Sequence, residues 1–163
     1  MAKPKSPRGT RATVALTRAG VEFSTHPYEH NPTPGSYGLD AAVALGLSPS
    51  RVFKTLLVSV DARLVVGVVP VSGQLDLKAM AEALGGKRAA MADPVTAERA
   101  TGYVVGGISP LGQTRSHPTV LDETALFFEV IYVSGGRRGL DLGVSPRDLI
   151  RLTGAVTAPI GRR

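Results

Sequence analysis

The chain has 163 residues, a net charge of +6, and neither Cys nor Trp. Its length fits one domain, and the lack of Cys excludes disulfides, thiolate metal sites and a cysteine nucleophile. No apolar run approaches the roughly 20 residues of a membrane span, and the first residues lack the apolar stretch of a signal peptide, so we expect a cytoplasmic protein.

The positive charge is concentrated at the two ends of the chain. Lys3, Lys5 and Arg8 lie in the first residues and Arg162 and Arg163 at the end, and without these five the remaining 14 basic and 13 acidic residues leave a net charge of +1. Basic ends of this kind suit a polyanion such as RNA, but they are equally typical of solvated tails. Charge alone is therefore weak support for nucleic-acid binding.

The first half of the sequence predicts helices and strands in alternation. Residues 1–9, with three cations and two prolines, predict a disordered basic tail, and residues 10–160 a single domain. In chain order we then expect a helix over 10–19 ended by Gly20, a strand over 21–27, a loop over 29–35, a helix over 37–45 ended by Gly46, a strand over 52–60, a strand over 64–71 paired with it as a hairpin, and a helix over 76–84.

The second half is richer in glycine and proline. We expect a helix from 93 to 100, an irregular segment over 101–119, strands at 119–121, 129–134 and 140–144, a helix over 145–152 and an edge strand over 155–160. Interspersed helices and hairpins indicate an α/β fold around a mixed β-sheet, and not a doubly wound parallel one.

The strand over 52–60 carries the first candidate for chemistry. Successive strand residues face opposite sides, so Lys54 shares a side with Val52, Leu56, Val58 and Val60, an otherwise apolar row. A cation there either packs its stem and extends its ammonium to water, or lies at the mouth of a pocket that takes an anionic or carbonyl-bearing ligand. The residues of this strand leave both readings open.

The histidines and serines do not complete a catalytic or metal-binding set. His26 and His30 lie on a strand and a proline-containing loop, where a four-residue spacing gives no common face, and His117 lies on a predicted surface loop. No serine has the sequence context of a nucleophile elbow. We therefore predict no metal site and no Ser-His-Asp triad.

Two glycine-rich segments remain. Gly106-Gly107-Ile108-Ser109-Pro110 and Ser134-Gly135-Gly136-Arg137-Arg138-Gly139-Leu140-Asp141 each fit either an ordinary turn or a loop whose backbone contacts a ligand. In the second segment the choice is between exposed arginines and an anion binder that lies near Asp141. Neither segment has the spacing of a Walker loop or a dinucleotide fingerprint.

Several long stretches in order resemble the YbaK/EbsC family, free-standing relatives of the editing domain of bacterial prolyl-tRNA synthetases. The similarity runs from about residue 12 to 155, and the lysine motif and the run from Val104 to Gln113 are most similar to its Cys-tRNA(Pro) deacylase branch. The matching stretches are 28–32, 52–58, 70–78, 91–94, 101–113 and 132–141.

The resemblance implies a mixed, barrel-like sheet surrounded by helices and an enzyme that releases cysteine from mischarged Cys-tRNA(Pro), and also from Cys-tRNA(Cys). In this mechanism the thiol of the substrate attacks its own ester, so no protein nucleophile, metal or cofactor is needed. The implied partners are the 3′ end of aminoacylated tRNA and prolyl-tRNA synthetase, and no membrane. The alternatives are an alanine-type or broader editing deacylase, and a non-catalytic module that binds tRNA or the synthetase.

By the same resemblance the catalytic residues are Lys54, Gly106 and Asp141. Lys54 is expected to hold the terminal adenosine or its phosphate and to stabilise developing negative charge, and Asp141 to bind the amine or the ribose. We expect a cavity shared by Lys54 and the two glycine segments. The implied substrate-binding residues are Tyr28, Tyr37, Thr55, Gly107, Ile108, Ser109, Gly135 and Gly136, and Tyr37 stands where the family commonly has Phe.

Overall fold

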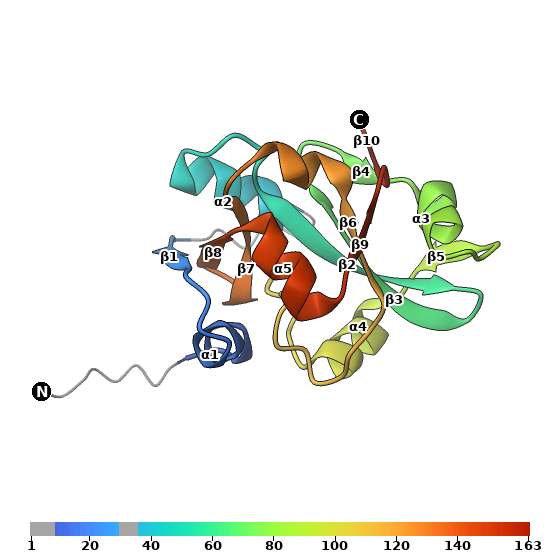
Figure 1. The fold of residues 1–163 in the computed structure, drawn as a ribbon, viewed down its shortest axis with the longest axis horizontal. Helices are drawn as coiled ribbons and strands as arrows, with labels where there is room; N and C mark the ends of the chain where they lie inside the picture. Colours follow the sequence, from blue (N-terminus) through green and yellow to red (C-terminus); the bar gives the residue numbers. More distant parts are fainter. Residues whose placement is uncertain (1–8, 30–35) are drawn as a thin grey trace, which may run out of the picture.

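The computed structural model describes residues 9–29 and 36–163 (Figure 1). Most of the predicted basic tail and of the loop predicted over 29–35, including His30, lies outside these residues. The helices are α1 (Arg11–Arg18), α2 (Tyr37–Leu45), α3 (Leu77–Ala83), α4 (Pro94–Thr101), the 3₁₀ helix η1 (Glu123–Phe127) and α5 (Pro146–Thr153). The strands are β1 (Ser24–Pro27), β2 (Phe53–Val60), β3 (Arg63–Pro70), β4 (Gln74–Leu75), β5 (Ala89–Met91), β6 (Thr119–Asp122), β7 (Ile131–Arg137), β8 (Leu140–Val144), β9 (Val156–Ala158) and β10 (Gly161–Arg162).

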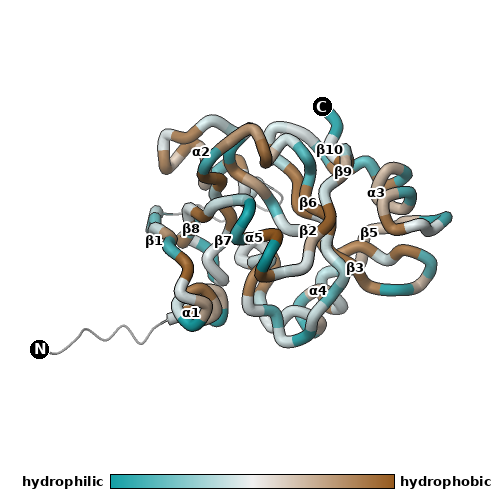
Figure 2. The backbone as a smooth tube through the Cα atoms, in the orientation of Figure 1, coloured by the Kyte–Doolittle hydropathy of each residue, from teal (hydrophilic) through white to brown (hydrophobic). Residues whose placement is uncertain are grey.

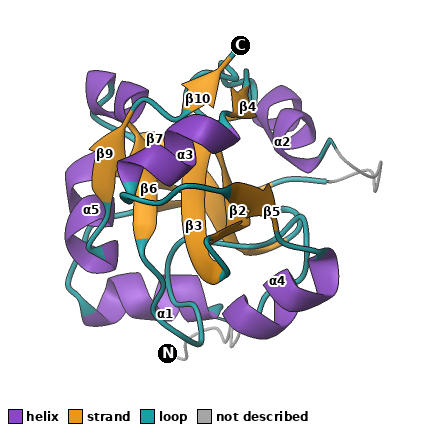
Figure 3. Ribbon diagram, turned by 90° about the vertical axis from the view of Figure 1, so that its right-hand side faces the viewer, coloured by secondary structure: helices purple, strands orange, loops and turns teal. Residues whose placement is uncertain are grey.

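The strands form three sheets with helices packed around them (Figure 3). The largest is mixed, in the order β5-β2-β3-β6-β9: β2 is antiparallel to β5 and β3, whereas β6 is parallel to β3 and β9. A second, antiparallel sheet has the order β1-β8-β7, and β4 pairs with β10. A parallel bridge between Val52 and Tyr132 joins the start of β2 to β7. The predicted mixed sheet surrounded by helices is confirmed, although the described strands do not close into a barrel.

The β2–β3 hairpin lies at the centre of the fold. Its turn is two residues long, and Asp61 and Ala62 both have positive φ angles, +50° and +69°. Two such residues give the turn a twist that matches the twist of the strands it joins. The Asp61 carboxylate accepts the backbone N–H groups of Lys87 and Arg88, and these hydrogen bonds lower the pKa of Asp61. This contact ties the turn to the segment before β5.

The two faces of β2 contribute to different parts of the core, as the alternation in the sequence predicts. Phe53 and Leu57 pack in a cluster with residues of α1, α4, α5 and the second sheet. Val58 and Val60 lie in the cluster that packs against α3. Figure 2 shows the hydrophobic residues of β2, β3 and β6 in the middle of the molecule. Because β2 is covered on both faces, an opening along its edge would lead directly into the core.

The element boundaries differ from the prediction where pairing determines them. The strand predicted over 21–27 begins only at Ser24, where pairing with Gly143 of β8 begins. The strand predicted over 129–134 runs from Ile131 to Arg137, because a register shift between Ser134 and Arg137 accommodates the two glycines within the strand. The short strands β4 and β5 and the helix η1 carry too few residues for a periodic signal, and the sequence did not predict them.

The predicted last edge strand is confirmed but is shorter, since β9 lies at the edge of the mixed sheet and ends at Ala158. Buried Asp122 caps η1, and its Oδ1 also accepts the N–H groups of Ile160 and Gly161, which separates β9 from β10. None of the helices in the described part of the chain is long and apolar enough to span a membrane.

Candidate functional site

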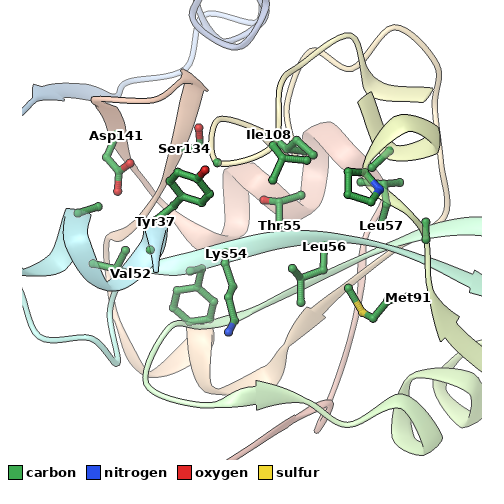
Figure 4. A pocket seen from close by; sticks show the side chains of 18 of the residues that line it. Tyr37, Val52, Lys54, Thr55, Leu56, Leu57, Met91, Ile108, Ser134 and Asp141 are labelled. Carbon is green, nitrogen blue, oxygen red and sulfur yellow. The ribbon is translucent and has the colours of Figure 1, made fainter. Parts of the chain in front are cut away.

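A cavity of about 350 Å³ opens beside the first half of β2 (Figure 4). Its walls come from Tyr28, from α2, from β2, from β5, α4 and the segment between them, from the 104–108 loop, and from β7 and β8. The lining residues are Tyr28, Tyr37, Gly38, Ala41, Val52, Phe53, Lys54, Thr55, Leu56, Leu57, Met91, Ala92, Pro94, Ala97, Val105, Gly106, Ile108, Ser134 and Asp141.

The cavity lies along β2 between its bridge to β7 at Val52 and its pairing with β5 at Val58. Strand β5 pairs with β2 only over Val58–Val60, and the N–H of Ala92 adds one bond to the carbonyl of Leu57. Backbone groups alternate between the two neighbours of an antiparallel strand, so those of Thr55 point to the same side as the Leu57 carbonyl, toward the cavity. The Thr55 hydroxyl is buried and makes no hydrogen bond to any described residue. A ligand in the cavity can therefore reach the backbone of Thr55 but not this enclosed hydroxyl.

Lys54 lies on the wall of the cavity and is half-buried. Figure 4 shows it leaving β2 on the side opposite to Thr55, as the strand alternation requires. Burial lowers the pKa of the Lys54 ammonium, because the charged form loses water. No carboxylate of the described residues lies within ion-pair distance of it. The structure thus gives a cavity-lining lysine whose charge has no protein counter-ion in the described part of the chain.

Asp141 is a buried acid at the opposite wall. It is 4% exposed, and burial raises the pKa of its carboxyl to about 7. The β7–β8 register places it opposite Ser134, and both side chains lie on the same side of the cavity in Figure 4. Burial and the nearby Asp141 charge also raise the pKa of the Tyr28 hydroxyl, in that order of importance. A bound cation, such as an amine, would stabilise the ionised form of this carboxyl.

The loop that carries Gly106 is fixed at several points. Glu98 accepts the N–H of Val105, the N–H of Gly107 donates to the carbonyl of Val104, and the Tyr103 hydroxyl donates to the carbonyl of Leu111. Gly106 has a φ of +90°, and a Cβ on it would lie 2.9 Å from the Tyr37 ring. Only glycine combines this backbone conformation with such close packing. The loop therefore presents bare backbone to the cavity.

Four of the residues assigned from the sequence lie outside the cavity lining. Gly107 packs against the backbone of Arg137, and Gly135 against Leu140. Gly136 faces Thr10 and Tyr103, on the α1 side of the hairpin. Ser109 is fully buried, and its hydroxyl accepts the N–H of Leu111. These contacts are to the protein itself, so we do not carry these four residues into the proposed mechanism.

The remaining assigned residues are brought together. Lys54, Gly106, Asp141, Tyr28, Tyr37, Thr55 and Ile108 all line the cavity, from five separate parts of the chain. The two glycine segments do share it, but the second contributes Ser134 and Asp141 and not its glycine pair.

The sequence missed Ser134 and the apolar end of the cavity. Ser134 could have been found from the hairpin register, which pairs it with Asp141. The apolar end carries no such signal, because Leu57, Met91 and Ala97 come from three elements and resemble ordinary core residues. Within the described ranges, no group of three His, Cys, Asp or Glu residues is placed to hold a metal.

The chain matches the aminoacyl-tRNA editing domain family over residues 34–152. It belongs to this family. It is also 34% identical to a protein of Enterococcus faecalis, the candidate Cys-tRNA(Pro)/Cys-tRNA(Cys) deacylase EbsC, over 161 residues that cover 98% of each chain.

Two solved structures have the same fold over nearly the whole chain. The hypothetical protein APE2540 matches with a TM-score of 0.82 and 29% identity, covering 93% of this chain and 99% of its own. A candidate trans-editing enzyme for prolyl-tRNA synthetase matches with a TM-score of 0.78 and 25% identity, covering 99% of this chain and all of its own. The resemblance noted in the sequence is therefore confirmed at the level of the family and the fold.

Proposed function

We propose that the protein is a trans-acting deacylase that releases cysteine from mischarged Cys-tRNA(Pro). The observation that carries the proposal is the cavity itself, in which a buried acid, a half-buried lysine and bare glycine backbone surround a space large enough for an aminoacyl ester. The family supports an editing role, and the Enterococcus relative supports cysteine as the amino acid.

Each polar group of the cavity can be assigned to one part of such a substrate. Asp141 binds the α-ammonium group, since burial makes its carboxylate favour a cationic partner. The backbone of Gly106 and the cavity-facing backbone of Thr55 hold the ester carbonyl in place, and the Lys54 ammonium stabilises negative charge that develops as the ester breaks. Tyr28 and Tyr37 wall the cavity and offer rings on which adenine can stack.

The reaction needs no nucleophile from the protein. The sulfur of the substrate cysteine attacks its own carbonyl carbon, the C–S bond forms, and the bond from that carbon to the ribose oxygen breaks. The thiol proton ends on the ribose oxygen, so the products are free tRNA and a cyclic thioester that water then opens to cysteine. The thiol and the ester already belong to one molecule, so the protein accelerates this step by holding them in the reactive conformation and by stabilising the charge that develops.

The reactivity of the amino-acid side chain then discriminates between substrates more sharply than its fit in the cavity. A pocket distinguishes one small group by only about 1–3 kcal/mol. Alanine carries no thiol, so an alanyl ester binds without a route to react. The near-neutral body of the chain offers little charge for tRNA binding, and we propose that prolyl-tRNA synthetase supplies tRNA selectivity, as suggested by the solved relative named as its trans-editing enzyme.

One observation favours a broader deacylase as the second candidate. The end of the cavity lined by Leu57, Met91 and Ala97 is apolar, and it can accept an aliphatic side chain as readily as a thiol. A protein that edits alanine through an attacking water would use this end for the side chain.

A substrate panel tests both candidates. Deacylation of Cys-, Ala- and Ser-charged proline tRNA is measured with the wild type, with Lys54→Ala, and with Lys87→Ala as an exposed lysine outside the cavity. We expect rapid loss of Cys only, a fall of at least about a hundredfold in Lys54→Ala, and no change in Lys87→Ala. Comparable rates on Ala-tRNA would favour the broader enzyme, and tRNA binding without deacylation would indicate a non-catalytic module.

A further inference from the structure

We propose that Arg138 binds the phosphate that joins the terminal adenosine of the substrate to the preceding nucleotide. The proposal rests on the function proposed above and decides, for Arg138, the choice between an exposed arginine and an anion binder that the sequence left open; Arg138 does not line the cavity itself. Arg138 packs against two residues that do line the cavity, Tyr37 and Gly106.

The Arg138 side chain is fixed on one edge and one face. Its Nε donates to the carbonyl oxygen of Val105 at 2.8 Å, and its Cζ lies 4.7 Å from the centroid of the Tyr37 ring. A Cβ on Gly106 would lie 2.9 Å from both the arginine Nε and the ring. A guanidinium group packed on an aromatic ring gains a cation–π interaction and loses much of its freedom. Arg138 is therefore ordered before any ligand arrives.

The charge of this ordered group is not neutralised by the protein. The two terminal nitrogens of Arg138 donate to no described residue, and the salt bridge found in the described ranges joins Arg151 to Asp148, in α5. A guanidinium group with one edge occupied still offers two parallel donors, which match two oxygens of a phosphate. Arg137, next to it, is exposed and makes neither the Val105 nor the Tyr37 contact.

The charges of the substrate select its phosphate as the group that Arg138 meets. The 3′ end of an aminoacyl-tRNA has a cationic amine, a neutral ester and an anionic phosphodiester. The amine goes to Asp141, the acid at the cavity wall. Lys54 lines the cavity, and we assign it to the charge that develops on the ester and not to the phosphate, the other role that the family resemblance implied for it. The phosphodiester is the one remaining charged group, and Arg138 lies beside the wall formed by Tyr37 and Gly106, outside the lining.

Ligand binding tests the proposal without relying on catalysis. The affinities of adenosine and of adenosine 5′-methylphosphate, which carries the same singly charged phosphodiester as RNA, are compared by titration at one fixed ionic strength. We expect the wild type to prefer the methylphosphate about tenfold or more, as a charge-assisted hydrogen bond gives. Arg138→Met should lose this preference, Arg138→Lys should keep part of it, and Arg137→Met should keep all of it.

Two results would overturn the proposal. One is equal affinity of the wild type for the two ligands, and the other is a loss in Arg138→Met that affects adenosine as much as the methylphosphate, which would indicate that Arg138 only supports the Gly106 loop.

Kinetics separate this proposal from the proposed function. Arg138→Met should slow deacylation of Cys-tRNA about tenfold to a hundredfold and leave the cysteinyl ester of adenosine within about threefold. If the wild type prefers the methylphosphate but deacylates neither Cys-tRNA nor the cysteinyl ester of adenosine, the proposed reaction is wrong and the phosphate site is supported.

Discussion

The two glycine-rich segments look alike in the sequence and differ in the fold. The first presents Gly106 to the cavity, with its backbone bare and the Tyr37 ring at the place that a Cβ would need. The second places Gly135 and Gly136 in a bulge of β7 that packs toward Leu140 and α1, and contributes to the cavity through the flanking residues Ser134 and Asp141. A glycine pair thus marks close packing, and only its neighbours in space decide whether that packing serves a ligand.

The largest effect is expected for Gly106→Ala. An added Cβ meets the Tyr37 ring and Arg138 at 2.9 Å, and alanine is strained at a φ of +90°. We expect kcat/KM on Cys-tRNA to fall more than about a hundredfold, because displacing reacting groups by an ångström costs about that much. The free energy of unfolding should fall by only about 1–3 kcal/mol. If activity falls only in proportion to the folded fraction, the loop does not touch the substrate.

Asp141→Asn tests the contribution of the acid that follows the glycine pair in the second segment. Since the pKa of this acid is raised from 3.8 to about 7 in the fold, the folded state binds the extra proton between these values. The stability of the wild type is therefore complete below about pH 4 and decreases until about pH 7. At pH 8 the Asn variant should be more stable, by about 4 kcal/mol at most.

The same variant should be a poorer enzyme. The carboxylate must be ionised to bind the ammonium group, so kcat/KM should rise with pH through about 7 in the wild type and not in the variant. The ratio of the two profiles removes the titration of the substrate itself. A ratio that does not vary with pH would contradict this role for Asp141.

Gly136→Ala is the matched change in the other segment. Its φ is +104°, and a Cβ would lie 3.0 Å from Thr10 and Tyr103, outside the cavity. We expect a loss of about 1–3 kcal/mol in the free energy of unfolding and an unchanged kcat/KM for the folded fraction. Loss of catalysis without loss of stability would place this glycine at the substrate and remove the difference between the segments.

The smallest effect is expected for Thr55→Val, on the strand that faces the first segment. The substitution removes a buried hydroxyl that has no partner among the described residues, so it should raise the free energy of unfolding by about 1 kcal/mol. It should leave kcat/KM nearly unchanged, because the enclosed hydroxyl cannot reach a ligand in the cavity. Chemical denaturation and steady-state kinetics measure the two effects, and a variant that is no more stable than the wild type would contradict the first.

Much of the fold followed from local patterns. Thr10, Gly46 and the pair Asp93-Pro94 mark helix ends in the structure as they do in the sequence, since caps and left-handed C-termini are set by neighbouring residues. The hairpin of β2 and β3 followed in the same way from two apolar runs and a short turn. The short strands β4 and β5 did not, because long-range pairing and not local preference forms them.

The cavity was only partly predictable, for the same reason. Lys54 was visible as a cation in an apolar row, and the family motifs pointed to Asp141 and Gly106. The division of roles between the glycine segments depends on which residues lie across from them. Gly106 lies against Tyr37, and Gly136 against Thr10 and Tyr103, and each of these contacts joins residues that are far apart in the sequence.

The most direct test of the whole account is a crystal structure with a stable mimic of the charged 3′ end, adenosine whose 3′ oxygen is replaced by an amide-linked cysteine. We expect the cysteine to lie within the cavity, with its ammonium hydrogen-bonded to Asp141 and its carbonyl beside Gly106 and Lys54. A mimic bound elsewhere on the surface, with the cavity empty, would contradict it.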